Sequence, residues 1–149
     1  MGILKYIIHP SRIIKIVEWT QMKRKFKSVG ENCKIGLNFS IVGPEDITIG
    51  NNFVGGDNIS LWAWESYNGR KRSQRPNLII GDKVTVTSNC VITCANKVTI
   101  GDGTLLGRGT FITDNSHGKN ESVEELRILP NNRELYSKGP VNIGRNVWT

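Results

Sequence analysis

Long hydrophobic runs are missing from this chain of 149 residues, and none approaches the ~20 apolar residues of a membrane-spanning helix. Cysteine is scarce. Cys33, Cys90 and Cys94 lack the paired spacing of a zinc site, and an odd number cannot all be bridged with one another. We therefore expect reduced thiols in a cytosolic protein, with no metal. Histidine is scarcer still, with only His9 and His117, which excludes a metal site built from three histidines.

Acidic residues are almost absent from the first part of the chain. Residues 1–28 contain seven lysines and arginines against Glu18 alone, so most of the net charge of +7 lies there. The remainder is nearly neutral, which argues against a nucleic-acid-binding body. The apolar residues of this segment recur with helical spacing, so we expect residues 1–28 to form a basic amphipathic helical segment. It either caps the first coil of the fold or makes peripheral contact with an anionic membrane at its inner face.

A signature of an aliphatic residue, any residue, Ile and Gly occurs four times, and its spacing indicates a repeat. Counted from a weaker copy at Val29, the gaps between successive Ile-Gly steps are 20, 31, 20 and 43 residues. A repeat of 20 residues with insertions at residues 67–77 and 118–140 explains every gap. The four copies are Ile47-Thr48-Ile49-Gly50, Leu78-Ile79-Ile80-Gly81, Val98-Thr99-Ile100-Gly101 and Val141-Asn142-Ile143-Gly144.

A six-residue period runs inside each repeat. Of fourteen positions at this spacing, twelve are aliphatic, and only Gly55 and Thr149 are not. Neither a helix nor plain alternation along one strand produces this pattern, and a β-sandwich does not hold such a register across insertions. Three six-residue units make three short strands, and successive coils stack on one another. The pattern predicts an all-β fold, a parallel β-helix over residues 29–149, in which Ile80 and Ile100 stack in a buried row.

Three stretches carry a resemblance to a known family. They are residues 78–82, the segment Phe111-Ile112-Thr113-Asp114-Asn115-Ser116-His117-Gly118, and Leu135-Tyr136-Ser137-Lys138-Gly139-Pro140 leading into the last Ile-Gly step. They resemble the hexapeptide-repeat acyltransferases, above all the bacterial O-acetyltransferases of surface-polysaccharide synthesis (colanic acid, O-antigen and capsule types). The resemblance covers about residues 29–149. It implies a left-handed β-helix, a homotrimer, acetyl-CoA as cosubstrate and a sugar or polysaccharide-precursor acceptor.

His117 is the candidate catalytic residue. It closes the last six-residue unit of the fourth coil, where residues 118–140 leave the repeat. An imidazole can accept a proton at neutral pH, and transfer of an acyl group from a thioester to a hydroxyl needs such a base. The resemblance implies this role for His117, with acetyl-CoA lying between two subunits. The β-helical carbonic anhydrases have a similar repeat but bind a metal through three histidines. This chain has only two, which excludes a carbonic anhydrase of that type.

Three polar residues lie near His117 in the sequence or on the adjacent coil. Asn96, Asp114 and Asn115 could orient the imidazole or contact the acceptor, and the sequence does not say which. The alternative is that they are ordinary turn residues, since Asp and Asn are common in turns.

The first insertion follows two further candidates for substrate binding, Trp62 and Trp64. The insertion itself, residues 67–77, contains four cations: Arg70, Lys71, Arg72 and Arg75. These either hold a phosphorylated or sugar ligand or belong to a solvated loop.

A non-catalytic β-helix scaffold or binding module remains the alternative to an enzyme. The resemblance also implies several more coils after Thr149, with much of the acetyl-CoA contact on them. From the sequence we therefore expect C-terminal coils to be missing, and an inactive truncated fragment is a further alternative.

Overall fold

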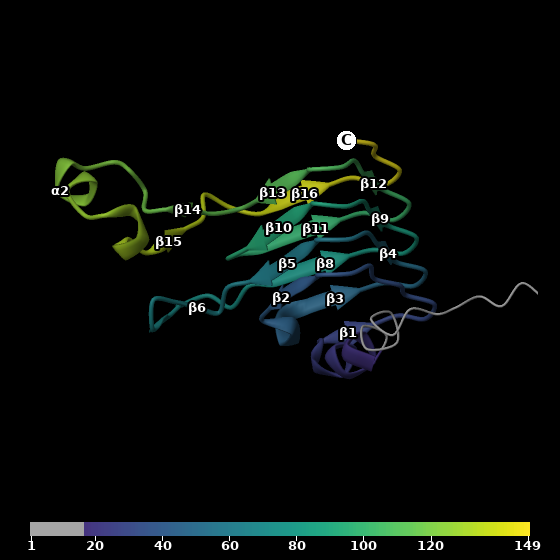
Figure 1. Ribbon diagram of the computed structural model, residues 1–149. Coiled ribbons are helices and arrows are strands. Elements are labelled where there is room, and N and C mark those ends of the chain that lie inside the picture. Colours follow the sequence, from purple (N-terminus) through teal and green to yellow (C-terminus); the bar gives the residue numbers. More distant parts are fainter. Residues whose placement is uncertain (1–16) are drawn as a thin grey trace, which may run out of the picture.

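Three parallel sheets of short strands form the body of the protein (Figure 1). The computed structural model describes residues 17–149. The chain visits the sheets in a fixed order and then begins again, so each 20-residue repeat is one pass through all three. The expected all-β class is confirmed. The first sheet contains β1 (Ser28–Val29), β3 (Ile47–Ile49), β8 (Asn77–Ile80), β11 (Lys97–Ile100) and β16 (Val141–Ile143); the second contains β4 (Val54–Gly55), β9 (Thr85–Val86) and β12 (Leu105–Leu106); the third contains β2 (Ser40–Val42), β5 (Ser60–Ala63), β10 (Val91–Cys94) and β13 (Phe111–Thr113).

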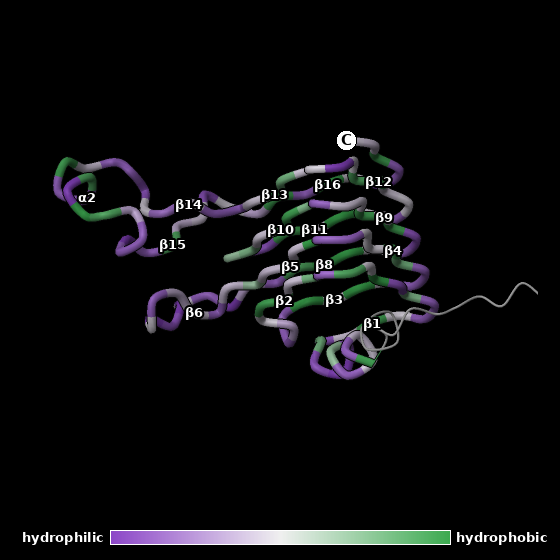
Figure 2. The backbone as a smooth tube through the Cα atoms, viewed as in Figure 1, coloured by the Kyte–Doolittle hydropathy of each residue, from purple (hydrophilic) through white to green (hydrophobic). Residues whose placement is uncertain are grey.

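The predicted register is confirmed in the first sheet. Ile100 pairs with Ile80 on one side and with Ile143 on the other. Ile80 pairs in turn with Ile49, across the first insertion. Ile49, Ile80 and Ile100 are each at most 1% exposed. Figure 2 shows the hydrophobic residues concentrated on the strands of the stack. Burying each such side chain contributes about 1.5–3 kcal/mol, and no single pass can bury its own aliphatic residues.

The exception at Gly55 has a steric cause. Gly55 is buried and pairs with Val86, so it holds the inward position that an aliphatic residue holds in other passes. The fully buried ring of Phe53 occupies the space instead. A Cβ on Gly55 would lie 2.7 Å from Cδ1 of Ile59 and 3.1 Å from Cε1 of Phe53. One large side chain in this pass therefore replaces the aliphatic residue two positions later.

The side chain that follows the Ile-Gly step accepts a hydrogen bond from the backbone of the equivalent turn in the preceding pass. The backbone N–H of Glu31 donates to Oδ1 of Asn51 at 2.9 Å, and that of Asn51 to Oδ1 of Asp82 at 2.7 Å. The N–H of Asp82 donates to Oδ1 of Asp102 at 2.9 Å. Glycine precedes these residues because the turns approach closely: a Cβ on Gly50 would lie 2.4 Å from Oδ1 of Asp82.

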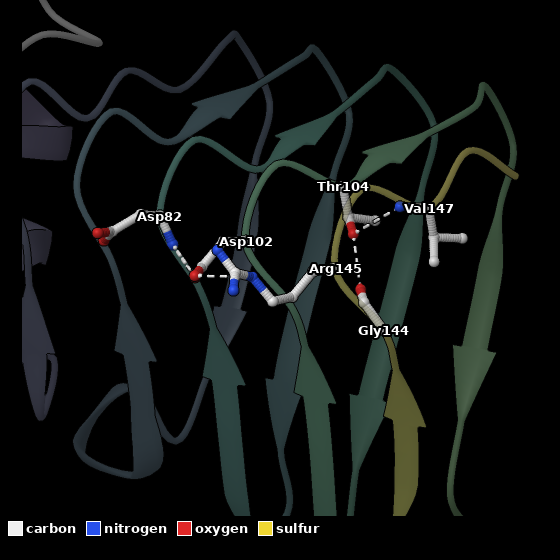
Figure 3. A network of polar contacts seen from close by, with 6 residues as sticks. All are labelled: Asp82, Asp102, Thr104, Gly144, Arg145 and Val147. Carbon is white, nitrogen blue, oxygen red and sulfur yellow. Dashed lines mark hydrogen bonds and ion pairs between the residues drawn. The ribbon is translucent and has the colours of Figure 1, made fainter.

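Figure 3 shows one end of this row, beside the last strand. Nε of Arg145 lies 3.5 Å from Oδ2 of Asp102, and both side chains are too exposed for the ion pair to stabilise the fold much. Thr104, by contrast, is buried. Its hydroxyl donates to the carbonyl of Gly144 at 2.9 Å and accepts from the N–H of Val147 at 3.3 Å. The buried hydroxyl therefore ties the segment after β16 to the pass before it.

Asparagine fills turn positions that need a positive φ. This region of the backbone is unfavourable for most residues but tolerated by Asn and Gly. The side-chain amide of Asn58 donates to Oδ1 of Asn89 at 3.0 Å, which links equivalent turns of two passes. The asparagines with positive φ in the turns of the stack are Asn32, Asn38, Asn52, Asn58, Asn89 and Asn146.

Two arms leave the stack on the same side (Figure 1). Arm one is the antiparallel hairpin of β6 (Ser66–Tyr67) and β7 (Arg70–Lys71). Arm two is the antiparallel pair of β14 (Ser116–His117) and β15 (Leu135–Tyr136), with α2 (Val123–Leu126) and the 3-10 helix η3 (Pro130–Asn132) between the two strands. Both arms begin slightly before the insertions expected from the sequence, since β6 starts at Ser66 and β14 at Ser116. The first insertion also ends earlier than expected, because Asn77 already belongs to β8.

The described part of the basic segment packs onto the first pass. Residues 17–22 are helical and are followed by the 3-10 helix η1 (Lys23–Lys25); a second, η2 (Pro44–Asp46), precedes β3. The ring of Trp19 is 8% exposed and lies edge-on to Phe26 at 5.8 Å and to Phe39 at 6.0 Å. Residues 1–16, which carry much of the expected amphipathic pattern, lie outside the described residues. In residues 17–149 no helix combines the length and the apolar character needed to cross a bilayer.

Candidate functional site

His117 lies on arm two rather than in the turn at the end of the fourth pass. That turn is formed by Asp114 and Asn115, after which the chain enters β14. His117 is exposed and pairs with Leu135 of β15. Residues directly opposite each other in an antiparallel pair share one face of the ladder, so His117 and Leu135 point the same way and Ser116 points the other way. The imidazole is therefore accessible on the face that looks toward arm one.

An uninterrupted row of four aromatic rings ends at His117. The ring of Tyr67 in arm one lies 5.3 Å from that of His117, centroid to centroid. Tyr67 lies 5.9 Å from Trp64, which lies 5.8 Å from Trp62. All three contacts are edge-to-face, an arrangement that aromatic pairs favour. The structure thus brings together His117 and both tryptophans singled out from the sequence, through Tyr67, which the sequence analysis did not identify.

The two tryptophans are held on the outer face of the third sheet. In β5 the alternation places Leu61 and Ala63 in the core, at 0% and 1% exposure, and turns Trp62 outward, as it does Trp64 directly after the strand. Nε1 of Trp62 donates to Oγ of Ser40 at 3.0 Å. Nε1 of Trp64 donates to Oγ1 of Thr93 at 2.9 Å. Each indole is fixed to a neighbouring pass, and each keeps part of its surface exposed.

Arg72 joins arm one to arm two. Its Nη1 donates to the carbonyl of Leu135 at 2.5 Å, and its Nε donates to the carbonyl of Ala95 at 3.1 Å. Leu135 is the residue opposite His117, so this guanidinium fixes the strand beside the candidate base to a turn of the third pass. The side-chain amide of Asn68 also donates to the carbonyl of Asn131. These contacts could not be predicted from the sequence, because nothing in its pattern distinguishes Arg72 from the other cations of the insertion.

The other cations of arm one are also paired. Nζ of Lys71 lies 2.9 Å from Oε1 of Glu65, and this hydrogen bond and charge lower the pKa of the Glu65 carboxyl. Arg70 lies 3.8 Å from Glu134 of arm two. Arg75 pairs with the buried carboxylate of Asp46, which raises the pKa of the guanidinium. These cations therefore have partners within the protein, and their role in holding a phosphorylated or sugar ligand stays a prediction.

The carboxylate of Asp114 holds the turn of the preceding pass. Asp114 is buried, and its carboxylate accepts the backbone N–H groups of Ala95, Asn96 and Lys97 at 2.7, 2.8 and 2.8 Å. The Sγ of Cys94 lies 3.7 Å from the same carboxylate. Burial, together with the nearby negative charge, raises the pKa of that thiol to about 12, so Cys94 stays protonated. The turn-residue alternative therefore fits Asp114.

Both asparagine candidates are engaged in the same region. The amide nitrogen of Asn115 lies 3.0 Å from Oδ1 of Asp114 and 3.4 Å from Oγ1 of Thr93. Oδ1 of Asn96 accepts from Nε2 of Gln74 at 2.7 Å. Asn115 stays beside the base of arm two, whereas Asn96 is bonded to Gln74 of the first insertion.

A second surface lies behind the β14–β15 ladder. It is a cleft of about 620 Å³, lined by Ser116 and Tyr136 from the face opposite His117, and by Lys119 and Lys138. Nζ of Lys119 lies 5.2 Å from the centre of the Tyr136 ring, within the range of a cation–π contact. Among the residues described, 17–149, no group of three or more His, Cys, Asp or Glu side chains could hold a metal ion.

Comparison with known proteins links this chain to one curated protein. Over 122 residues it is 32% identical to a protein of Escherichia coli (strain K12) described as "Putative lipopolysaccharide biosynthesis O-acetyl transferase WbbJ". The alignment covers 78% of this chain and 57% of the relative, so the chain spans somewhat more than half of that protein's length. No family model and no solved structure matches the chain.

Proposed function

We propose that the protein is an O-acyltransferase that moves an acetyl group from acetyl-CoA to a hydroxyl of a sugar, in the synthesis of a surface polysaccharide. The observation that carries the proposal is the exposed imidazole of His117, placed where the aromatic row from the sheet meets arm two. The 32% identity to a protein described as an O-acetyl transferase supports the reaction class.

In the proposed reaction His117 is the general base. Its imidazole takes the proton of the acceptor hydroxyl while the hydroxyl oxygen attacks the thioester carbonyl. A tetrahedral oxyanion forms and is stabilised by a hydrogen-bond donor such as a backbone N–H. The carbon–sulfur bond then breaks, the proton passes from the imidazolium to the leaving sulfur, and the products are the acetyl ester and free coenzyme A.

The proposal extends to the fold and the assembly. We infer a left-handed β-helix of the hexapeptide-repeat type over residues 29–149, preceded by a basic segment at residues 1–28. Parallel strands paired at the repeat spacing support this inference. We also propose a homotrimer with sites between subunits, since a cyclic arrangement closes a head-to-tail interface. The protein would work in the cytoplasm, with residues 1–28 available for contact with the inner face of the membrane.

The test measures thiol release from acetyl-CoA by the full-length protein, with a panel of sugars, for the wild type and for His117→Ala. Loss of the base should lower the rate by roughly 10²- to 10⁴-fold, while acetyl-CoA binding persists. His9→Ala, the same change at the other histidine of the chain, should leave the rate unchanged. Near-normal turnover of His117→Ala would show that His117 is not the base. If the wild type neither binds acetyl-CoA nor releases thiol, the scaffold alternative replaces the enzyme.

A further inference from the structure

The aromatic row is larger than the proposed chemistry requires. A general base needs one imidazole and a bound hydroxyl, yet three more rings continue from His117 across the third sheet. The farthest, Trp62, is separated from His117 by Trp64 and Tyr67, with successive centroids 5.8, 5.9 and 5.3 Å apart.

The outward tryptophans do not belong to the core. Trp62 pairs across the sheet with Val42 and Thr93, so the indole stands beside much shorter side chains. The surface of these indoles that stays exposed contributes nothing to burial. A stability role explains the inward residues of β5 but gives no reason for indoles at both outward positions.

The row is rigid before any ligand arrives. The two indole N–H groups already have hydrogen-bond partners on neighbouring strands, Ser40 and Thr93, and the rings brace one another edge-to-face. Fixed side chains lose little conformational entropy on binding. What remains exposed on these indoles is their apolar ring surface, because the polar group of each is occupied within the protein.

We infer that the row binds a segment of glycan several sugars long, so that the acceptor is an oligosaccharide or polymer rather than a single sugar. This inference rests on the proposed function. The faces of aromatic rings carry partial negative charge and attract polarised C–H groups, which sugars present on the faces of their rings. Each step along the row is comparable to the length of one hexose. A chain lying from Trp62 to Tyr67 presents a hydroxyl of its last unit to His117.

The charges around the row agree with a neutral occupant. The cations of arm one are paired with Glu65, Glu134 and Asp46, and Arg72 is bound to two carbonyls. These partners leave little uncompensated positive charge for a phosphate at the row, whereas an uncharged glycan needs none.

The experiment compares acceptor lengths. The probes are size-fractionated oligosaccharides, from one to four sugars, prepared by mild acid from the de-O-acetylated surface polysaccharide of the producing strain. KM and kcat are measured by thiol release, and binding is measured separately by quenching of tryptophan fluorescence. The variants are Trp62→Ala, Trp62→Phe and, as a matched control, Trp148→Ala, since Trp148 is 80% exposed and lies outside the row.

In the wild type, KM should fall with acceptor length. Trp62→Ala should raise KM for the tetrasaccharide roughly 10-fold, the loss expected for one stacked ring, and leave kcat and the monosaccharide KM unchanged. Trp62→Phe should retain most of the effect of length, and Trp148→Ala all of it. A KM independent of length, or an equal loss at every length, would overturn the inference while the transferase stands. Length-dependent quenching in the wild type, without thiol release, would support the glycan site and refute the transferase.

Discussion

Arg72→Ala should loosen arm two without unfolding the stack. The guanidinium makes two hydrogen bonds, to the carbonyls of Leu135 and Ala95. Hydrogen bonds from a charged donor are worth about 1.5–3 kcal/mol each, and half-burial of Arg72 places these two at the low end. Opening arm two breaks only the bond to Leu135, so we expect the free energy of opening the arm to fall by about 1.5–2 kcal/mol, which corresponds to a roughly 10- to 30-fold larger equilibrium constant for opening.

Hydrogen exchange followed by mass spectrometry measures this directly. The amide of Gly118, which donates to the carbonyl of Glu134 at 2.8 Å, reports on the β14–β15 ladder. Its exchange should accelerate by the factor above in Arg72→Ala, whereas amides of β8 and β11 keep their protection. Arg72→Lys should be intermediate, because an ammonium group lacks the planar fork that reaches both carbonyls.

Arg70→Ala is the matched control, since it removes a cation from the same hairpin. Its ion pair with Glu134 is 3.8 Å long, and both side chains are more than two-thirds exposed (68% and 77%), so exchange should change by less than about fivefold. Unchanged exchange at Gly118 in Arg72→Ala would refute the role of Arg72 in holding the arm. Equal acceleration in β8 and β11 would show that Arg72 stabilises the whole fold instead.

Three further predictions concern the stack. Thr104→Val leaves two backbone groups without their buried partner and should lower the free energy of unfolding by about 1–2 kcal/mol in urea titrations; an unchanged midpoint would contradict this. Gly55→Ala should cost about 1–3 kcal/mol through crowding, and adding Phe53→Leu should recover part of that loss; purely additive losses would argue against competition for one space. At pH 8 a thiol reagent should label the half-buried Cys33 before the buried Cys94, whose pKa is raised to about 12, and equal rates would show that burial does not protect Cys94.

The stack could be predicted from the sequence because its interior is periodic. Ile80 and Ile100 pair as the 20-residue spacing requires, and the register continues across both insertions. The exception at Gly55 could be noticed but not explained, since the compensating ring of Phe53 lies at a different position of the six-residue unit. Packing of this kind depends on the size and direction of each side chain, which decide whether Phe53 or residue 55 fills the interior. The spacing of aliphatic residues does not contain that information.

The positions of the two arms could be predicted from the sequence, but their internal structure could not. Their strands are two residues long, too short for an alternating pattern to appear. The two arms leave the stack after its second and fourth passes and meet each other, and this places Tyr67 against His117. The meeting of the arms also brings Arg72, one of the four cations of the first insertion, into contact with arm two. Contacts between two insertions leave no periodic signal in either of them.

The polar candidates near the imidazole show the same limit. Asp114 is only three residues from His117 in the sequence, but the turn directs its carboxylate to the backbone of the preceding pass. Trp62 and Trp64 precede the first insertion in the sequence, and the structure connects them to His117 through ring contacts. Their role in binding a substrate stays a prediction.

The destination of the acetyl group tests the central claim most directly. The full-length protein is incubated with acetyl-CoA labelled in the acetyl group and the de-O-acetylated oligosaccharide, and the products are analysed by mass spectrometry before and after mild alkali. The account predicts labelled acetyl on the sugar as an alkali-labile ester, formed roughly 10²- to 10⁴-fold more slowly by His117→Gln. Label found only as free acetate, or ester formed equally fast by the variant, would contradict it.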